Sequence, residues 1–145
     1  KSTPEGVMDE PVNPLALAIT AGATFVARGF AGDPQGLTAL MIAAIEHKGF
    51  AVLDILQPCV TFDKVHTYPW YRQRLYKLET EGYTADNKLK AMEKAMEWGD
   101  KIPVGIFYKE IRPTSEDREP ALGEKPLVEL PLAIEHLDDL VNEFV

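Results

Sequence analysis

Three scarcities limit the functions open to this chain of 145 residues: cysteine, long apolar runs and positive charge. Cys59 is its single cysteine, which excludes an internal disulfide and suits a reducing compartment. No segment reaches the run of about 18 apolar residues that spans a bilayer, and no signal-peptide pattern opens the chain. The net charge of −8 argues against nucleic acid, which attracts clustered Lys and Arg. We therefore expect a cytoplasmic protein that binds neither nucleic acid nor membrane.

Residues 24–56 carry the pattern of a strand, a helix and a second strand. Residues 24–30 and 50–56 are short runs rich in apolar and aromatic side chains, as in buried strands. Between them, Asp33 and Pro34 form a favourable helix start. Apolar side chains then recur at helical spacing and predict one buried face: Leu37, Leu40, Met41, Ala44 and Ile45. Such a unit places two parallel strands in one sheet, with a right-handed crossover. The pattern predicts an α/β fold, with a mostly parallel sheet and flanking helices.

Further elements are expected on either side of this unit. Asn13 and Pro14 predict the start of a short buried helix over residues 14–21. Asp86 and Asn87 predict the start of another, and its inward face should carry Leu89, Met92, Ala95 and Met96. Residues 68–78 suit either a helix or an extended segment, and the spacing of their apolar side chains favours a helix. Residues 104–108 are typical of a short strand.

The chain is expected to divide into two domains, residues 1–109 and residues 110–145. Residues 110–126 are polar and interrupted by proline and glycine, which predicts a surface loop. From residue 131 onward, four apolar residues share one face of a predicted amphipathic helix: Ile134, Leu137, Val141 and Phe144. We expect this second domain to contact a neighbouring protein chain of the same assembly.

The segment at residues 57–62, QPCVTF, is the strongest functional candidate, because ligands gather at the carboxyl ends of parallel strands. The Cys59 thiol is open to three interpretations: a nucleophile, a metal ligand or a small packed side chain. A nucleophile needs a base, and His66 is the nearest one in sequence. The three histidines, His47, His66 and His136, show no metal-ligand spacing. Cys59 would therefore bind a metal only with ligands from elsewhere.

Residues 64–77 form a basic stretch in an acidic protein. Cations and aromatic rings alternate in it: Lys64, His66, Arg72, Arg74 and Lys77 with Tyr68, Trp70, Tyr71 and Tyr76. The stretch fits either a solvated helix face or a docking surface for an acidic partner or anionic ligand. A nucleotide site is not expected, because residues 28–33 lack the third glycine of a dinucleotide motif and Asp33 would compete with phosphate.

Six short segments in the first 78 residues carry a resemblance to a known family. They are residues 1–4 (KSTP), 10–18 (EPVNPLALA), 22–30 (GATFVARGF), 47–50 (HKGF), 57–62 (QPCVTF) and 68–71 (YPWY). In order and spacing they resemble the thiamine-diphosphate-binding beta subunit of 2-oxoacid:ferredoxin oxidoreductases. The 2-oxoglutarate and broad 2-oxoacid branches look nearest, and residues 57–62 are the most specific part.

This resemblance implies a fold, a reaction and a set of cofactors. The fold would be the C-terminal part of a thiamine-diphosphate-binding fold. The reaction would be oxidative decarboxylation of a 2-oxoacid to acyl-CoA, with electrons passed through a 4Fe-4S cluster to ferredoxin. Thiamine diphosphate and magnesium (Mg2+) would complete the cofactors, and Cys59 would be one of four thiolate ligands of the cluster. The implied partners are the alpha (or alpha and gamma) subunit, the N-terminal half, ferredoxin, coenzyme A and the 2-oxoacid.

The chain also departs from the family pattern. It contains no GDG motif, no CxxC pair and no Asn-containing cofactor loop, all of which belong to the N-terminal half in the family. We therefore expect a subunit fragment with an incomplete active site, inactive alone, and we assign no catalytic residue to it. The alternative is a non-catalytic α/β interaction domain in which Cys59 is structural.

Overall fold

The computed structural model describes residues 8–119, 126–129 and 141–143. The chain divides into two units, residues 1–112 and residues 113–145, and each is described separately. In the described residues, no helix has both the length and the apolar content needed to cross a membrane.

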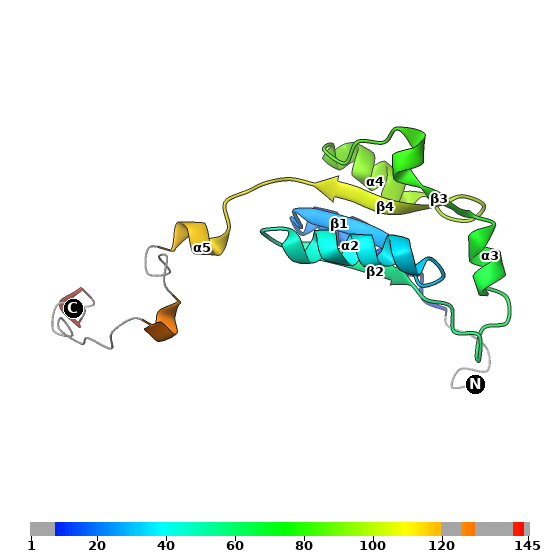
Figure 1. The fold of residues 1–145 in the computed structure, drawn as a ribbon, viewed down its shortest axis with the longest axis horizontal. Helices are drawn as coiled ribbons and strands as arrows, with labels where there is room; N and C mark the ends of the chain where they lie inside the picture. The colour runs from blue at the N-terminus through cyan, green and yellow to red at the C-terminus, as the bar shows by residue number, and fades with distance from the viewer. Residues whose placement is uncertain (1–7, 120–125, 130–140, 144–145) are drawn as a thin grey trace. The chain divides into compact units, whose positions relative to one another are not determined.

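The first unit is built on a four-stranded sheet with the strand order β2-β1-β4-β3 (Figure 1). Its strands are β1 (Phe25–Phe30), β2 (Ala51–Leu56), β3 (Leu75–Lys77) and β4 (Ile102–Lys109). Its helices are α1 (Pro14–Thr20), α2 (Pro34–Glu46), α3 (Tyr68–Arg72), the 3-10 helix η1 (Leu78–Glu81) and α4 (Lys88–Met96). Helix α2 packs against β1 and β2, while α1 packs against α4 and the same two strands.

The predicted strand–helix–strand unit is confirmed. Strands β1 and β2 are parallel, with Phe25 opposite Ala51 and Phe30 opposite Leu56. Helix α2 connects them and begins where expected, because the Asp33 carboxylate accepts a hydrogen bond of 3.0 Å from the Gly36 N–H. The handedness of the crossover stays a prediction.

The sheet is mostly parallel, as predicted, but its central pair of strands, β1 and β4, is antiparallel. Strands β3 and β4 are parallel, whereas β4 runs antiparallel to β1. The register between β1 and β4 shifts between Val26 and Ala27, which indicates a bulge. The sheet therefore consists of two parallel pairs joined through an antiparallel centre.

The main core lies where α1 and α4 pack together and against the sheet. Its buried members include large side chains from α1, β1 and β4, together with small ones from α4: Leu15, Ile19, Val26, Phe107, Ala91 and Ala95. Asn13 joins the two helices, because its Oδ1 accepts from the Ala16 N–H at 3.0 Å and its Nδ2 donates to the Ala95 carbonyl at 2.7 Å. The predicted N-cap of the first helix is confirmed.

Asn13→Ala is expected to destabilise the protein by about 0.5–2 kcal/mol, because it removes the N-cap of α1 and the link to α4. The check is chemical denaturation followed by circular dichroism. Asn13→Ser is the matched control, since its hydroxyl oxygen can still cap the helix and the substitution removes the amide donor to Ala95. A stability of Asn13→Ala equal to that of the wild type would contradict the assigned role.

The helix predicted over residues 68–78 is wrong in its second half. Helix α3 ends at Arg72, and the chain then forms β3, in which Leu75 lies opposite Ile102 of β4. The Ile102 N–H donates to the Arg74 carbonyl at 2.9 Å. Pairing with a strand nearly thirty residues away thus overrides a local pattern that favours a helix.

The predicted inward faces of two helices are also partly wrong. In α2, Leu37 lies against β1 near Gly29, but Met41 and Ile45 are exposed. In α4, Ala91 and Ala95 are buried, whereas Leu89 and Met96 are 77% and 66% exposed. Met92 packs against the core beside Ala91 and Ala95, so the inward prediction holds for Met92 and Ala95 and is wrong for Leu89 and Met96.

In the second unit, the described residues include a short helix inside the segment predicted to be a loop. Helix α5 (Ser115–Arg118) is held by a capping box, in which Thr114 and Asp117 exchange side-chain and backbone hydrogen bonds. A 3-10 helix, η3 (Leu127–Glu129), follows. Of the predicted amphipathic helix, Ile134, Leu137 and Phe144 lie outside the described residues, and Val141 is exposed. The domain boundary at residue 109 stays a prediction.

Candidate functional site

The carboxyl ends of β1 and β2 define one edge of the sheet, at Phe30 and Leu56. Because β4 is antiparallel to β1, and β3 is parallel to β4, both of these strands begin at that same edge. The segment at residues 57–67 leaves β2 here and leads through α3 to β3 (Figure 1). The sheet topology therefore places the Cys59 segment where α/β proteins bind ligands.

Cys59 lies in a tight turn at the start of this segment. Its carbonyl accepts hydrogen bonds from the Phe62 N–H at 3.2 Å and the Asp63 N–H at 2.9 Å. Its side chain is exposed and its thiol is free. Within the described residues the side chain is therefore not packed, and the thiol is open to a ligand.

Asp63 fixes the rest of the loop. One carboxylate oxygen accepts the N–H groups of Val65 at 2.8 Å and His66 at 3.0 Å, and the other lies 2.7 Å from His66 Nδ1. These hydrogen bonds, above all the one from the His66 N–H, lower the pKa of Asp63 to about 2. Asp63 is therefore ionised at neutral pH, and the loop keeps its shape there.

His66 is engaged away from the thiol. Its ring pairs with Asp63 and meets the Trp70 ring edge-on, with 4.7 Å between the ring centres. In the part of the chain that the structure describes, no hydrogen bond joins His66 to Cys59. The geometry thus gives no support to the hypothesis of a Cys59–His66 nucleophile pair.

A chain of aromatic contacts braces the loop against the end of β1. The ring centres of Trp70 and Tyr71 are 5.0 Å apart. The ring centre of Phe30 lies 5.7 Å from that of Tyr71 and 5.7 Å from that of Tyr68. Burial raises the pKa of the Tyr71 phenol, so this group stays protonated at neutral pH. The rings of the basic aromatic stretch therefore pack between the candidate site and the end of β1.

The cations of the same stretch make individual contacts. Lys64 Nζ donates to the Val60 carbonyl at 2.6 Å, and the Arg74 guanidinium lies 4.2 Å from the centre of the Trp70 ring. Lys77 forms an ion pair of 3.1 Å with Asp33. The Lys64 side chain is exposed and the Lys77 side chain is half-exposed, so both make a structural contact and still reach solvent.

A buried ion pair beneath the site was missed by sequence reasoning. Arg28 Nε donates to Asp54 Oδ2 at 2.8 Å across β1 and β2, and the two side chains are 3% and 21% exposed. The guanidinium lies over the rings of Trp98 and Phe107, at 5.3 Å and 5.8 Å from their centres. One terminal nitrogen of Arg28 is buried without a hydrogen-bond partner. The sequence did contain a signal for this pair, because Arg28 and Asp54 each lie in the middle of an otherwise apolar strand.

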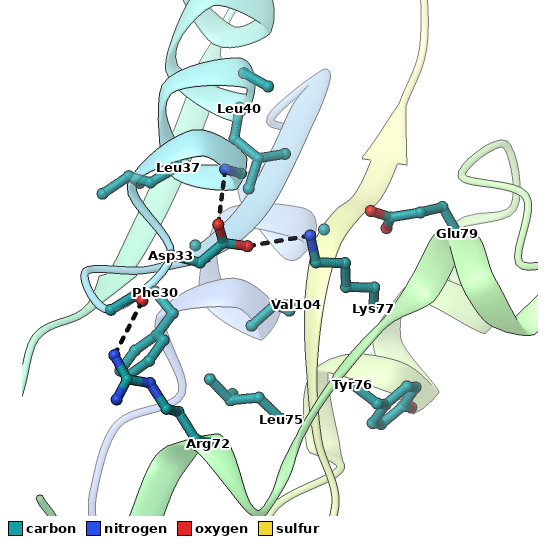
Figure 2. A pocket seen from close by; sticks show the side chains of 15 residues that line it. Phe30, Asp33, Leu37, Leu40, Arg72, Leu75, Tyr76, Lys77, Glu79 and Val104 are labelled. Atoms are coloured by element: carbon teal, nitrogen blue, oxygen red, sulfur yellow. Dashed lines mark hydrogen bonds and ion pairs between the residues drawn. The ribbon is translucent and has the colours of Figure 1, made fainter. Parts of the chain in front are cut away.

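A cavity of about 510 Å³ lies beside α2, over β3, β4 and the end of β1 (Figure 2). Its apolar walls come from Leu37, Leu40, Leu75 and Val104. Asp33 lies at its rim and binds both Gly36 and Lys77, and these hydrogen bonds, Gly36 first, lower the pKa of Asp33. Because Asp33 already occupies the start of α2 and neutralises Lys77, the cavity offers apolar surface rather than an anion site.

The described residues contain no group of three or more His, Cys, Asp or Glu side chains placed to hold a metal ion. A cubane iron–sulfur cluster takes four ligands, usually thiolates, and this chain has one cysteine. An exposed thiol on a hydrogen-bonded turn fits the part of a single ligand. The described residues therefore do not form a complete metal site, and Cys59 is a candidate for one ligand at most.

Comparison with known proteins identifies the family of the chain. Residues 59–124, beginning at Cys59, match the family model of the C-terminal region of the pyruvate ferredoxin oxidoreductase beta subunit. The beta subunit of 2-oxoacid:ferredoxin oxidoreductase from Sulfolobus sp. is 46% identical, over 81% of this chain and 42% of that protein. The beta subunit of 2-oxoacid:ferredoxin oxidoreductase 1 from Aeropyrum pernix is 42% identical, over 86% of this chain and 42% of that protein.

A solved structure is similar as well. It is the 2-oxoglutarate:ferredoxin oxidoreductase from Magnetococcus marinus with 2-oxoglutarate, coenzyme A and succinyl-CoA bound. The similarity has a TM-score of 0.72 and 39% identity, and it covers 79% of this chain and 39% of that one. The chain thus spans about two fifths of the length of these three relatives. From these matches and from the α/β fold, the chain belongs to the beta-subunit family of the 2-oxoacid:ferredoxin oxidoreductases.

Proposed function

We propose that this chain acts as part of an oxidoreductase that converts a 2-oxoacid, coenzyme A and oxidised ferredoxin to acyl-CoA, CO2 and reduced ferredoxin. The observation that carries the proposal is Cys59, an exposed thiol on a braced turn at the carboxyl edge of the sheet. The region that matches the family model begins at this residue. The 2-oxoglutarate and broad 2-oxoacid relatives support a substrate of that class.

Cys59 is proposed as one ligand of a 4Fe-4S cluster, with the other three thiolates supplied from outside these residues. The cluster would carry electrons one at a time. Thiamine diphosphate and Mg2+ are proposed to bind where a GDG motif is supplied, and this chain has none. Within this scheme, the turn orients the thiol, and Asp63 holds the loop in one conformation.

The chain alone is expected to be inactive and to work in an assembly. The proposed partners are the N-terminal half of the subunit, the alpha (or alpha and gamma) subunit and ferredoxin, all in the cytoplasm. The exposed apolar residues of α2 and of the turn after it support such contacts: Met41, Ile42, Ile45 and Phe50. These side chains would be covered in the assembly.

The test is anaerobic co-expression of this chain with an N-terminal half and an alpha subunit from a close relative. We expect ferredoxin reduction that requires both a 2-oxoacid and coenzyme A, and none from this chain alone. The measurement is ferredoxin absorbance, with 2-oxoglutarate and pyruvate as alternative substrates. A purified assembly with full cofactor content and no such activity would refute the proposal.

The alternative of a non-catalytic interaction domain required a packed, structural Cys59. The exposed thiol gives that alternative no support.

A further inference from the structure

Arg28 carries a buried hydrogen-bond donor that nothing in the described residues satisfies. Among those residues Arg28 alone combines a charge with burial, since it is 3% exposed. Its Nε donates to Asp54, but its terminal nitrogen Nη1 is enclosed and has no hydrogen-bond partner there. Leaving a buried donor unpaired is unfavourable, above all on a charged group, and native proteins contain few such donors. The free nitrogen therefore indicates an acceptor from outside the described residues.

The surroundings of the guanidinium favour a protein acceptor over a water molecule. The rings of Trp98 and Phe107 lie beside it, with their centres 5.3 Å and 5.8 Å from its central carbon. A buried water is held by about two to four polar groups, which aromatic rings do not supply. An acceptor carried by a packed segment of protein needs no further polar partners at this place.

The charge balance at Arg28 favours a neutral carbonyl oxygen over a second carboxylate. Asp54 already pairs with Arg28 at 2.8 Å and is itself only 21% exposed. A second carboxylate would bury a net negative charge, which is strongly unfavourable. A backbone carbonyl accepts a hydrogen bond without adding charge.

The elements around Arg28 are incompletely covered within this chain. Strand β2 ends the described sheet, and none of its residues is fully buried, whereas every residue of β1 is. Trp98, which lies over the guanidinium, is 56% exposed. This chain covers only 42% of the Sulfolobus beta subunit, so a relative of that length has other segments to place here. A segment packed over β2 and Trp98 would bring its carbonyls close to Arg28.

We propose that Arg28 Nη1 donates to a backbone carbonyl of the N-terminal half of the subunit, which packs over β2 and Trp98. Arg28 then links the two halves, with Nε on Asp54 and Nη1 on the other half. This inference rests on the proposed function, which includes that half as a partner, and adds a specific contact to it. The link lies on the strand that leads directly to Cys59, so it also helps to set the position of the thiol relative to the other half.

The test compares two cation-to-methionine variants of this chain, each co-expressed with an N-terminal half from a close relative. Arg28→Met removes the proposed donor. Lys94→Met is the matched control, because Lys94 Nζ donates to Glu97 and Tyr76, which both lie in this chain. The measurement is the rate at which the tagged variant leaves the complex in dilute urea with excess untagged wild-type chain. We expect about tenfold faster dissociation for Arg28→Met and a rate within about twofold of the wild type for Lys94→Met.

A second variant guards against a loss of folding. Arg28→Lys keeps a positive charge beside Asp54 but has no second nitrogen, so it should also dissociate faster while its circular dichroism matches the wild type. Wild-type dissociation rates in both Arg28 variants, equal acceleration in Lys94→Met, or wild-type halves that do not assemble would overturn the link. Halves that assemble through Arg28 into an enzyme that reduces no ferredoxin would instead contradict the proposed function.

Discussion

Cys59→Ser in the complete subunit is expected to lower the iron content by at least about half and to abolish 2-oxoacid-dependent ferredoxin reduction. The serine hydroxyl has nearly the same size but does not ionise at neutral pH, so it is a poor substitute for a thiolate on iron. Because Cys59 is exposed, the substitution should leave the folding of the chain intact. Iron analysis and visible absorbance, measured anaerobically, provide the check.

Thr61→Ala is the matched control, because Thr61 is exposed in the same turn and two residues from Cys59. It should retain both iron and activity. If Cys59→Ser kept a full cluster and transferred electrons at the wild-type rate, Cys59 would not be a ligand. The turn would then be a scaffold, and the proposed function would lose the residue on which it rests.

Asp54→Ala is expected to destabilise the protein by about 3–5 kcal/mol. The substitution leaves the Arg28 guanidinium buried without its counter-ion, and one of its nitrogens already has no hydrogen-bond partner. Chemical denaturation followed by circular dichroism and tryptophan fluorescence provides the measurement, since Trp98 lies over Arg28.

Two comparisons separate this effect from a general loss of a salt bridge. Arg28→Met should lower the free energy of unfolding less than Asp54→Ala does. A methionine side chain suits the contact with Trp98 and Phe107, and the carboxylate of Asp54 that remains is partly exposed to water. Lys77→Ala removes a half-exposed ion pair and should cost about 0–1 kcal/mol. Equal losses for Asp54→Ala and Lys77→Ala would show that burial of Arg28 carries no special cost.

The starts of the helices followed from local residues. Asn13, Asp33 and Asn87 were each expected at an N-cap, and each accepts hydrogen bonds from backbone N–H groups at the first turn of its helix. Such a contact spans two or three residues, so the sequence around it is sufficient. The parallel β1–β2 pair followed in the same way, because a strand–helix–strand pattern has few folded arrangements.

The features that were wrong or missed depend on residues far apart in the chain. Residues 75–77 became a strand because β4 supplied its partner. Helix α4 packs on α1 and the sheet with Ala91 and Ala95 in the core, and Leu89 lies outside this contact. The Arg28–Asp54 pair joins residues 26 positions apart. No local pattern contains the position of such a partner.

The turn at residues 57–62 also has features that the local sequence determines and one that only the fold determines. Its place after a parallel strand, its proline and its thiol could be read from residues 57–62, and so could the resemblance to the family. Whether the thiol was packed or exposed depended on how the chain folds around it, and the structure leaves it exposed. Local hydrogen bonding can be anticipated from neighbouring residues, whereas burial is the sum of contacts from the whole fold.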